Sequence, residues 1–241
     1  NVQNYDGINQ DPDAHAERLV ALWSQIAESF HSYPDTLYFE LLNEPHDKLT
    51  ADKNNALILK LLTAIRESNP ERAVIIDPAE WGNAPGLARL MLPAADRNLI
   101  PTFHYYDPHD FTHQGAPWEH REHQAPVDWP TKSYTQKAIA IAFDRALQWA
   151  EQQQRPLYLG EFGVYQAADM AARVRWTRAV VEEARARHLP YAYWELRSGF
   201  GAYDMEKAEW RTPLLDALVP KHAQPSASGP GALPVAAGGS S

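Results

Sequence analysis

The segment TLYFELLNEP (Thr36–Pro45) places a polar Asn-Glu pair directly after an apolar run. The weak alternation of Thr36–Leu42 is typical of a parallel strand that is buried on both faces. Pro45 restricts the backbone of Glu44 and cannot donate a ladder hydrogen bond, so the strand is expected to end there. The sequence therefore predicts a carboxylate at the carboxyl end of a buried strand.

Four further runs have the same apolar or aromatic character, namely Ala73–Asp77, Leu99–Tyr105, Leu157–Phe162 and Tyr191–Leu196. Five stretches are predicted to be helical, namely Asp13–Phe30, Ala51–Ser68, Thr135–Gln153, Ala168–His188 and Arg211–Leu218. In the first of these, apolar residues recur at the 3, 4, 7 spacing that predicts one buried stripe. Strands that alternate with helices indicate βα units and a parallel sheet.

The position of the polar residues favours a barrel over an open sheet. An open doubly wound sheet is expected to carry a Gly-rich phosphate loop, but Gly160-Glu161-Phe162-Gly163 lacks the third glycine and opens no immediate helix. Polar residues gather instead where the runs end, at Asn43-Glu44, Glu80-Trp81, His104, Tyr106, Glu161 and Trp194-Glu195. A TIM (β/α)8 barrel assembles its active site at that end from several strands. The sequence therefore predicts an α/β fold of this type.

Composition excludes several classes of function. The 241 residues include 22 Lys and Arg against 31 Asp and Glu, and the net charge of −9 comes without any basic run. This balance argues against a nucleic-acid partner or an anionic membrane. No apolar run approaches the ~20 residues of a membrane helix, and the absence of cysteine excludes disulfides and thiolate chemistry. Most of the 8 Trp, 11 Tyr and 7 Phe are expected in the core, but this number of Trp leaves some for flat-faced ligands such as sugar rings.

Two glutamates on different strands are the main candidates for chemistry. Glu44 and Glu161 each end an apolar run, and aromatic residues lie near both. Glycoside hydrolysis needs two carboxylates, one protonated and one ionised. Either residue alone is more often a salt-bridge or helix-cap residue, so the pair carries the prediction. Trp194 is a candidate sugar platform or core residue, and Trp81 and Trp118 are weaker candidates of the same kind.

Histidines near the predicted site admit two interpretations. His104 and Tyr106 lie two residues apart and point the same way from a strand, where they could bind a sugar and a carboxylate or simply pack in the core. His109 and His113 are close in sequence, but no HxH or HExxH pattern is present, so no metal site is predicted. The absence of GxSxG argues against a serine hydrolase.

Several motifs together resemble glycoside hydrolase family 5, and specifically its bacterial endo-β-1,4-glucanases (cellulases). The motifs are Leu41–His46, Thr102–Pro108, Phe111–Ala116, Leu159–Gly163, and Trp194-Glu195 with Gly199–Asp204. The resemblance covers Asn1 to about Leu218. It implies a retaining endo-acting hydrolase that needs neither metal nor cofactor and whose partner is a β-glucan chain. A family-5 β-mannanase, a mixed-linkage glucanase and an inactive sugar-binding barrel fragment remain alternatives.

The resemblance also implies residue roles. Glu44 would be the acid/base and Glu161 the nucleophile. The candidates for binding substrate are Asn43, Trp81, His104, Tyr106, Trp194 and Glu195. Among these, Asn43 would bind the sugar 2-hydroxyl, Tyr106 would hydrogen-bond the nucleophile, and Trp194 would stack on the sugar before the cleavage point.

The two ends of the chain depart from the family pattern. The His-His pair that ends the family's third strand is replaced by Gln3-Asn4, and the family's arginine on the second strand has no counterpart. We therefore expect about strands three to eight, a barrel that is incomplete at its N-terminus, within a catalytic domain of residues 1–220. Residues 221–241, rich in Pro, Ala, Gly and Ser, are expected to form a flexible tail or linker, which would suit attachment to a carbohydrate-binding module. No signal peptide is visible, but the resemblance implies a secreted or periplasmic protein.

Overall fold

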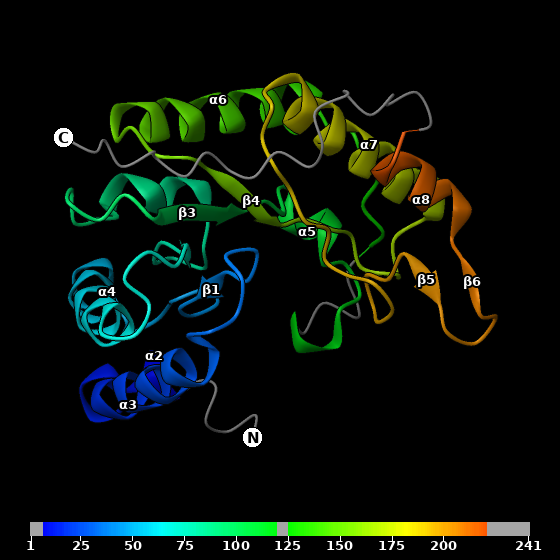
Figure 1. Cartoon of the computed structure of the whole chain (residues 1–241). Helices are drawn as coiled ribbons and strands as arrows, with labels where there is room; N and C mark the ends of the chain where they lie inside the picture. The colour runs from blue at the N-terminus through cyan, green and yellow to red at the C-terminus, as the bar shows by residue number, and fades with distance from the viewer. Residues whose placement is uncertain (1–6, 120–124, 221–241) are drawn as a thin grey trace. The chain divides into compact units, whose positions relative to one another are not determined.

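A computed structural model describes residues 7–119 and 125–220 (Figure 1). These residues form two compact units. The first unit contains residues 7–103 and 149–157, and the second contains residues 104–119, 125–148 and 158–220. Gln3, Asn4 and the predicted tail at 221–241 lie outside the described residues. That residues 1–220 form one catalytic domain stays a prediction.

The first unit is built on parallel strands. β1 (Phe39–Glu40) pairs with β2 (Val74–Ile76), which pairs in turn with β3 (Leu99–His104). Every residue of β3 is buried. The absence of a polar face is what parallel strands covered on both sides require, so the apolar runs of the sequence were correctly interpreted as strands.

Helices of the first unit follow the predicted ranges closely. They are α2 (Gly7–Gln10), α3 (Pro12–Phe30), α4 (Ala51–Arg66) and the 3-10 helix η1 (Ala84–Arg89). The carboxylate of Asp11 accepts the N–H of Ala14 at 3.3 Å and caps the start of α3. α3 packs on α4. The short α2 and η1 were not predicted, because a single turn carries no periodicity.

The predicted buried stripe of α3 is only partly present. Trp23 and Ala27 are buried, whereas Leu22, Ile26 and Phe30 are exposed. Trp23 packs against the ring of Phe39 with centroids 5.4 Å apart, and its indole N–H donates to the carbonyl of Leu41 at 2.9 Å. The expectation of one continuous buried face is therefore wrong, because the sheet covers a narrower strip of the helix than the apolar spacing occupies.

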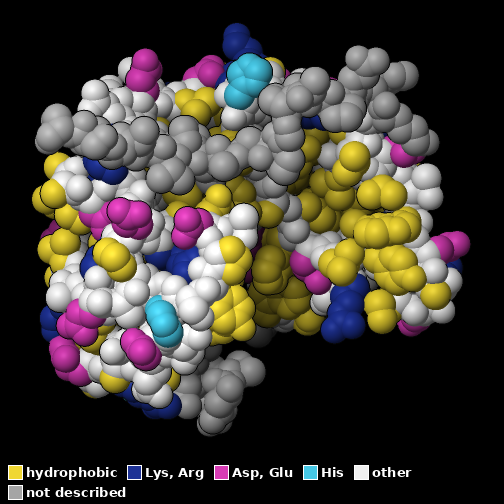
Figure 2. All heavy atoms as spheres, in the orientation of Figure 1, with side chains coloured by type: hydrophobic (Ala, Val, Ile, Leu, Met, Phe, Trp, Pro, Cys, Tyr) yellow, Lys and Arg dark blue, Asp and Glu magenta, His cyan; other side chains and the backbone are white. Residues whose placement is uncertain are grey.

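The second unit combines one four-residue strand with helices and a hairpin. Its elements are α5 (His109–Thr112), η2 (Pro117–Glu119), α6 (Gln136–Gln152, which runs on into the first unit), β4 (Tyr158–Glu161), α7 (Met170–Ala186), β5 (Tyr203–Asp204), β6 (Glu209–Trp210) and α8 (Thr212–Leu218). α7 packs on α8, and β5 pairs antiparallel with β6. Hydrophobic side chains gather around α8 and β5 on the face in Figure 2.

The predicted strand Tyr191–Leu196 is present as an extended segment with little ladder pairing. It contributes one parallel bridge, from Tyr191 to Leu159. The backbone N–H of Trp194 donates to the carbonyl of Phe162 at 2.9 Å. The chain then turns, because the Glu195 carboxylate accepts the N–H groups of the loop that follows. Among the described residues, no helix is both long and apolar enough to cross a bilayer.

Candidate active site

In the first unit, Glu44 lies on the turn that follows β1, as its position before Pro45 predicts. Its φ is 47°, in the left-handed region that residues other than glycine rarely adopt. Its N–H donates to Asp77 Oδ2 at 2.8 Å, and its carbonyl lies 2.6 Å from His46 Nδ1. Side chains therefore contact both polar backbone groups of Glu44. Asn43 precedes it and is half-buried.

Trp81 presents one aromatic face beside this turn. Its ring stacks on His46 with centroids 3.5 Å apart and planes 10° apart. The backbone N–H of Trp81 donates to the carbonyl of Pro45 at 3.2 Å. The residue is 54% exposed. Because His46 covers one side of the indole, the exposed side is suited to stacking on a flat ligand such as a sugar ring.

In the second unit, Glu161 ends β4, and two polar side chains of the same unit lie beside its carboxylate. Tyr106 Oη donates to Glu161 Oε2 at 2.9 Å, and His104 Nδ1 lies 3.6 Å from the same oxygen. The backbone is held as well, since Tyr105 N–H donates to the Glu161 carbonyl at 2.9 Å. The side chains of Glu161 and His104 are 14% and 2% exposed. The structure thus brings together three of the predicted site residues.

A cluster of aromatic rings extends from Tyr106. Ring centroids lie 4.9 Å apart between Tyr106 and His113, 5.3 Å between His113 and Phe200, and 5.5 Å between Phe200 and Tyr165. Trp118, 55% exposed, packs edge-on against Tyr165 at 5.1 Å. Tyr165 and Phe200 were not predicted as site residues. Phe200 falls inside the Gly199–Asp204 motif, which was the available signal for it.

Trp194 and Glu195 have different surroundings. Trp194 is exposed, and a Cβ atom at Gly163 would lie 2.1 Å from its carbonyl oxygen, so only glycine permits this approach. Glu195 Oε1 accepts the N–H groups of Ser198 at 2.8 Å and Phe200 at 3.2 Å. These hydrogen bonds hold the backbone of residues 198–200 against the Glu195 carboxylate. The role of Glu195 in binding substrate stays a prediction.

Burial raises the pKa of two groups around the second-unit site. The pKa of Asp107 is raised by burial, against the lowering effect of His109, and burial also raises the pKa of Tyr105. Taken by itself, neither unit gathers three metal-ligating side chains among its described residues. The absence of a metal or cofactor stays a prediction.

Parallel βα units whose strands end in polar side chains are typical of the (β/α) barrel class of proteins, which assemble their active sites at that end of the strands. The sequence matches the Cellulase (glycosyl hydrolase family 5) family over residues 1–199. The chain belongs to glycosyl hydrolase family 5, and its described residues contain part of the TIM barrel of that family, as predicted.

Several relatives agree with this assignment. Endoglucanase H of Acetivibrio thermocellus is 31% identical over 234 residues, which are 95% of this chain but 25% of that protein. Cel5A of Thermotoga maritima, solved with cellobiose, is 42% identical with a TM-score of 0.86, over 89% of this chain and 70% of that one. Cellulose synthase subunit Z of Clostridioides difficile is 36% identical with a TM-score of 0.84, over 88% and 71%. The chain thus spans about a quarter of Endoglucanase H.

Proposed function

We propose that this protein is a retaining, endo-acting glycoside hydrolase that cleaves β-1,4-glucan chains of the cellulose type. The observation that carries the proposal is the Glu161 carboxylate at the end of β4, contacted by Tyr106 at 2.9 Å, in a chain of family 5. The relatives named above support it, because they include endoglucanases and a structure with cellobiose.

The proposed reaction has two steps. Glu161 attacks the anomeric carbon while Glu44 gives its proton to the leaving oxygen, which forms a glycosyl-enzyme ester and releases the shortened chain. Glu44 then removes a proton from water as the water attacks the anomeric carbon, and Glu161 leaves as a carboxylate. Tyr106 orients the Glu161 carboxylate through its hydrogen bond, and Asn43, Trp81 and Trp194 bind the sugar.

Hydrolysis assays test this proposal. The wild-type chain should release reducing sugar from carboxymethylcellulose, and NMR should show product whose anomeric configuration is retained. Glu161→Gln should lower the rate by a factor of about 10⁴ or more, because the nucleophile is lost. The matched control is Glu209→Gln, at an exposed position on β6, which should leave the rate unchanged. Inverted product, or equal rates for the two variants, would contradict the proposal.

Mannan is a second candidate substrate. Cel5A of Thermotoga maritima, 42% identical, has also been solved with mannotriose, with a TM-score of 0.86. Both carboxylates would serve β-1,4-mannan and β-1,4-glucan equally, since the chemistry at the anomeric carbon is the same. The ratio of kcat/KM for mannan, lichenan and carboxymethylcellulose decides between the candidates.

We also propose that the protein acts outside the cytoplasm, because a polymeric glucan cannot cross a membrane. Fractionation of the producing cells tests this proposal, which fails if the protein is confined to the cytoplasm. A carbohydrate-binding module joined through the Pro- and Gly-rich segment 221–241 would raise the local concentration of enzyme on the polymer. The sequence that follows Ser241 in the full gene tests that part.

A further inference from the structure

We propose that Asp77 and His46 are positioning residues that hold the backbone of Glu44 in the conformation its acid/base role requires. This inference rests on the proposed function, because it assigns to both residues an action exercised through Glu44. All three residues lie in the first unit, and the sequence pattern singled out neither Asp77 nor His46 for chemistry.

The backbone of Glu44 needs external support. Its φ of 47° lies in a region that costs free energy for a residue with a Cβ atom, and such conformations persist only where the surroundings enforce them. Asp47, three residues later, has a φ of 53°. The turn from Glu44 to Asp47 is therefore held by its contacts rather than by the preferences of its residues.

Asp77 supplies the first of these contacts. It follows β2 and is 2% exposed, and its Oδ2 accepts the Glu44 N–H at 2.8 Å. Its own carbonyl accepts Asn54 Nδ2 from α4 at 3.2 Å. A buried carboxylate that accepts a backbone N–H makes one of the stronger hydrogen bonds in proteins. The end of β2 thus fixes where the Glu44 peptide lies.

His46 supplies the second contact. Its Nδ1 lies 2.6 Å from the Glu44 carbonyl and must carry a hydrogen to bond with it. The ring cannot swing away easily, because it is 6% exposed and stacks on Trp81 at 3.5 Å. The backbone N–H of His46 donates to Asn9 Oδ1 at 3.1 Å. Both polar groups of the Glu44 backbone are therefore bonded to side chains that are buried.

The contacts to the Glu44 backbone determine where the Glu44 carboxyl group can lie. Fixing φ at Glu44 fixes the direction in which its side chain leaves the turn. An acid must lie within hydrogen-bonding distance of the leaving oxygen, and a misplacement of about 1 Å can cost a hundredfold in rate. Loss of the contacts that Asp77 and His46 make to the Glu44 backbone should therefore impair proton transfer more than it impairs sugar binding.

The test compares Asp77→Ala with two other variants of the full chain. Asp77→Asn keeps an oxygen that can accept the Glu44 N–H. Asn54→Ala is the matched control, because it removes a buried hydrogen bond to Asp77 without touching the carboxylate. Each variant is assayed on a cello-oligosaccharide, whose leaving group needs a proton, and on 2,4-dinitrophenyl β-cellobioside, whose leaving group does not.

We expect Asp77→Ala to lower kcat/KM for the oligosaccharide about tenfold or more and to leave kcat/KM for the activated substrate within about twofold. Asp77→Asn should recover most of the loss, and Asn54→Ala should show no such selectivity. Equal losses on both substrates, no loss, or the same selectivity in Asn54→Ala would overturn the proposal.

Amide hydrogen exchange separates this proposal from the proposed function. The Glu44 amide should exchange faster in Asp77→Ala than in wild type, whereas in Asn54→Ala it should exchange at the wild-type rate. Unchanged exchange in Asp77→Ala would refute the proposal that Asp77 holds the Glu44 backbone. If the wild-type chain hydrolyses neither substrate, the proposed function fails, whereas the exchange data still decide whether Asp77 holds the turn.

Discussion

At the scale of single residues, the two proposed catalytic carboxylates are held in different ways. Glu161 is contacted at the carboxylate itself, by Tyr106 at 2.9 Å. Glu44 is held through its backbone, by Asp77 at 2.8 Å and His46 at 2.6 Å. Substitutions around Glu161 should therefore act directly on the nucleophile, whereas those around Glu44 should act through the turn that carries it.

Tyr106→Phe tests the contact to the nucleophile. The variant removes the hydroxyl and keeps a ring to pack on His113 and Phe200. We expect kcat/KM on carboxymethylcellulose to fall roughly ten- to a hundredfold, because a hydrogen bond to a charged group worth ~1.5–3 kcal/mol is lost. Tyr134→Phe, at an exposed position, is the control and should be neutral. Full activity of Tyr106→Phe would show that Glu161 does not depend on this hydroxyl.

Asp204→Asn tests an effect of pH on stability. The N–H of Lys207 lowers the pKa of Asp204, and Arg211 and the N–H of Glu206 lower it further. A depressed pKa contributes stability above the unfolded value of about 3.9, and this contribution is lost as the pH falls through the folded pKa. We expect Asp204→Asn to lower the melting temperature at pH 7, by a difference that shrinks as the pH falls below about 4. A constant difference at all pH values would contradict this linkage.

The sequence predicted part of the site for a physical reason. Glu44 and Glu161 were found because a polar residue at the end of a buried strand breaks an apolar run. Asp77 breaks such a run too, in AVIID (Ala73–Asp77), but the sequence does not show that its carboxylate meets the Glu44 N–H. The contribution of His46 depends on a left-handed turn, which the residue types present do not specify.

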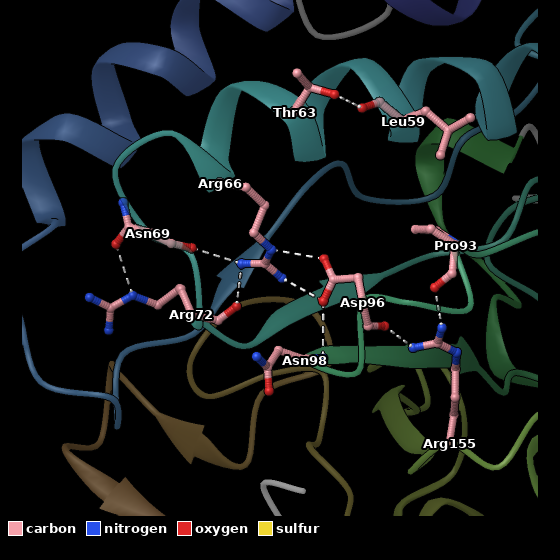
Figure 3. Close-up of polar contacts among 9 residues, drawn as sticks. All are labelled: Leu59, Thr63, Arg66, Asn69, Arg72, Pro93, Asp96, Asn98 and Arg155. Carbon is pink, nitrogen blue, oxygen red and sulfur yellow. Dashed lines mark hydrogen bonds and ion pairs between the residues drawn. The ribbon is translucent and has the colours of Figure 1, made fainter. Parts of the chain in front are cut away.

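At the scale of elements, a network of arginines joins α4 to the loops around it (Figure 3). Arg66 bonds Asp96 through two nitrogens, at 2.8 Å and 3.2 Å, and also donates to the carbonyls of Asn69 and Arg72. Arg155 donates to the carbonyl of Asp96 at 2.8 Å. One acidic residue thus connects the end of α4 to the segment that precedes β4.

Arg72 also joins separate segments of the first unit, and its substitution tests how much these hydrogen bonds contribute to the free energy of unfolding. Its guanidinium is buried and donates to four backbone carbonyls between α3 and β1, those of Phe30, Tyr33, Pro34 and Leu37. A lysine cannot reach all four, so Arg72→Lys should lower the free energy of unfolding by roughly 2–4 kcal/mol. Urea unfolding measures this change, and Arg178→Lys, exposed on α7, is the control. Equal stability of both variants would show that the carbonyls find other donors.

Prediction of the elements succeeded where periodicity was long. The five predicted helices match the observed α3, α4, α6, α7 and α8 to within two residues at each end. The hairpin of β5 and β6 was missed, because strands of two residues show no alternation. The predicted strand Tyr191–Leu196 lacks a full ladder, because Glu195 forms a turn that depends on contacts with residues further along the chain.

At the scale of the whole molecule, the aromatic content divides between core and surface. Trp176, Phe103, Phe143 and Phe162 are fully buried, whereas Trp81, Trp118, Trp194 and Trp210 are exposed. Exposed indoles are expensive to keep in water and are typical of surfaces that bind flat apolar faces. This division leaves several exposed rings available for the proposed polysaccharide substrate.

The proposed retaining mechanism requires a covalent intermediate on Glu161. A 2-deoxy-2-fluoro-β-cellobioside with a dinitrophenyl leaving group should form a glycosyl-enzyme ester that hydrolyses slowly, because the fluorine destabilises the oxocarbenium-like transition state. Mass spectrometry of the digested chain should find one added cellobiosyl group, on the peptide that contains Glu161, and none in Glu161→Gln. A label on a different residue, or release of dinitrophenol with no covalent adduct and inverted product, would contradict the assignment of Glu161 as the nucleophile of a retaining mechanism.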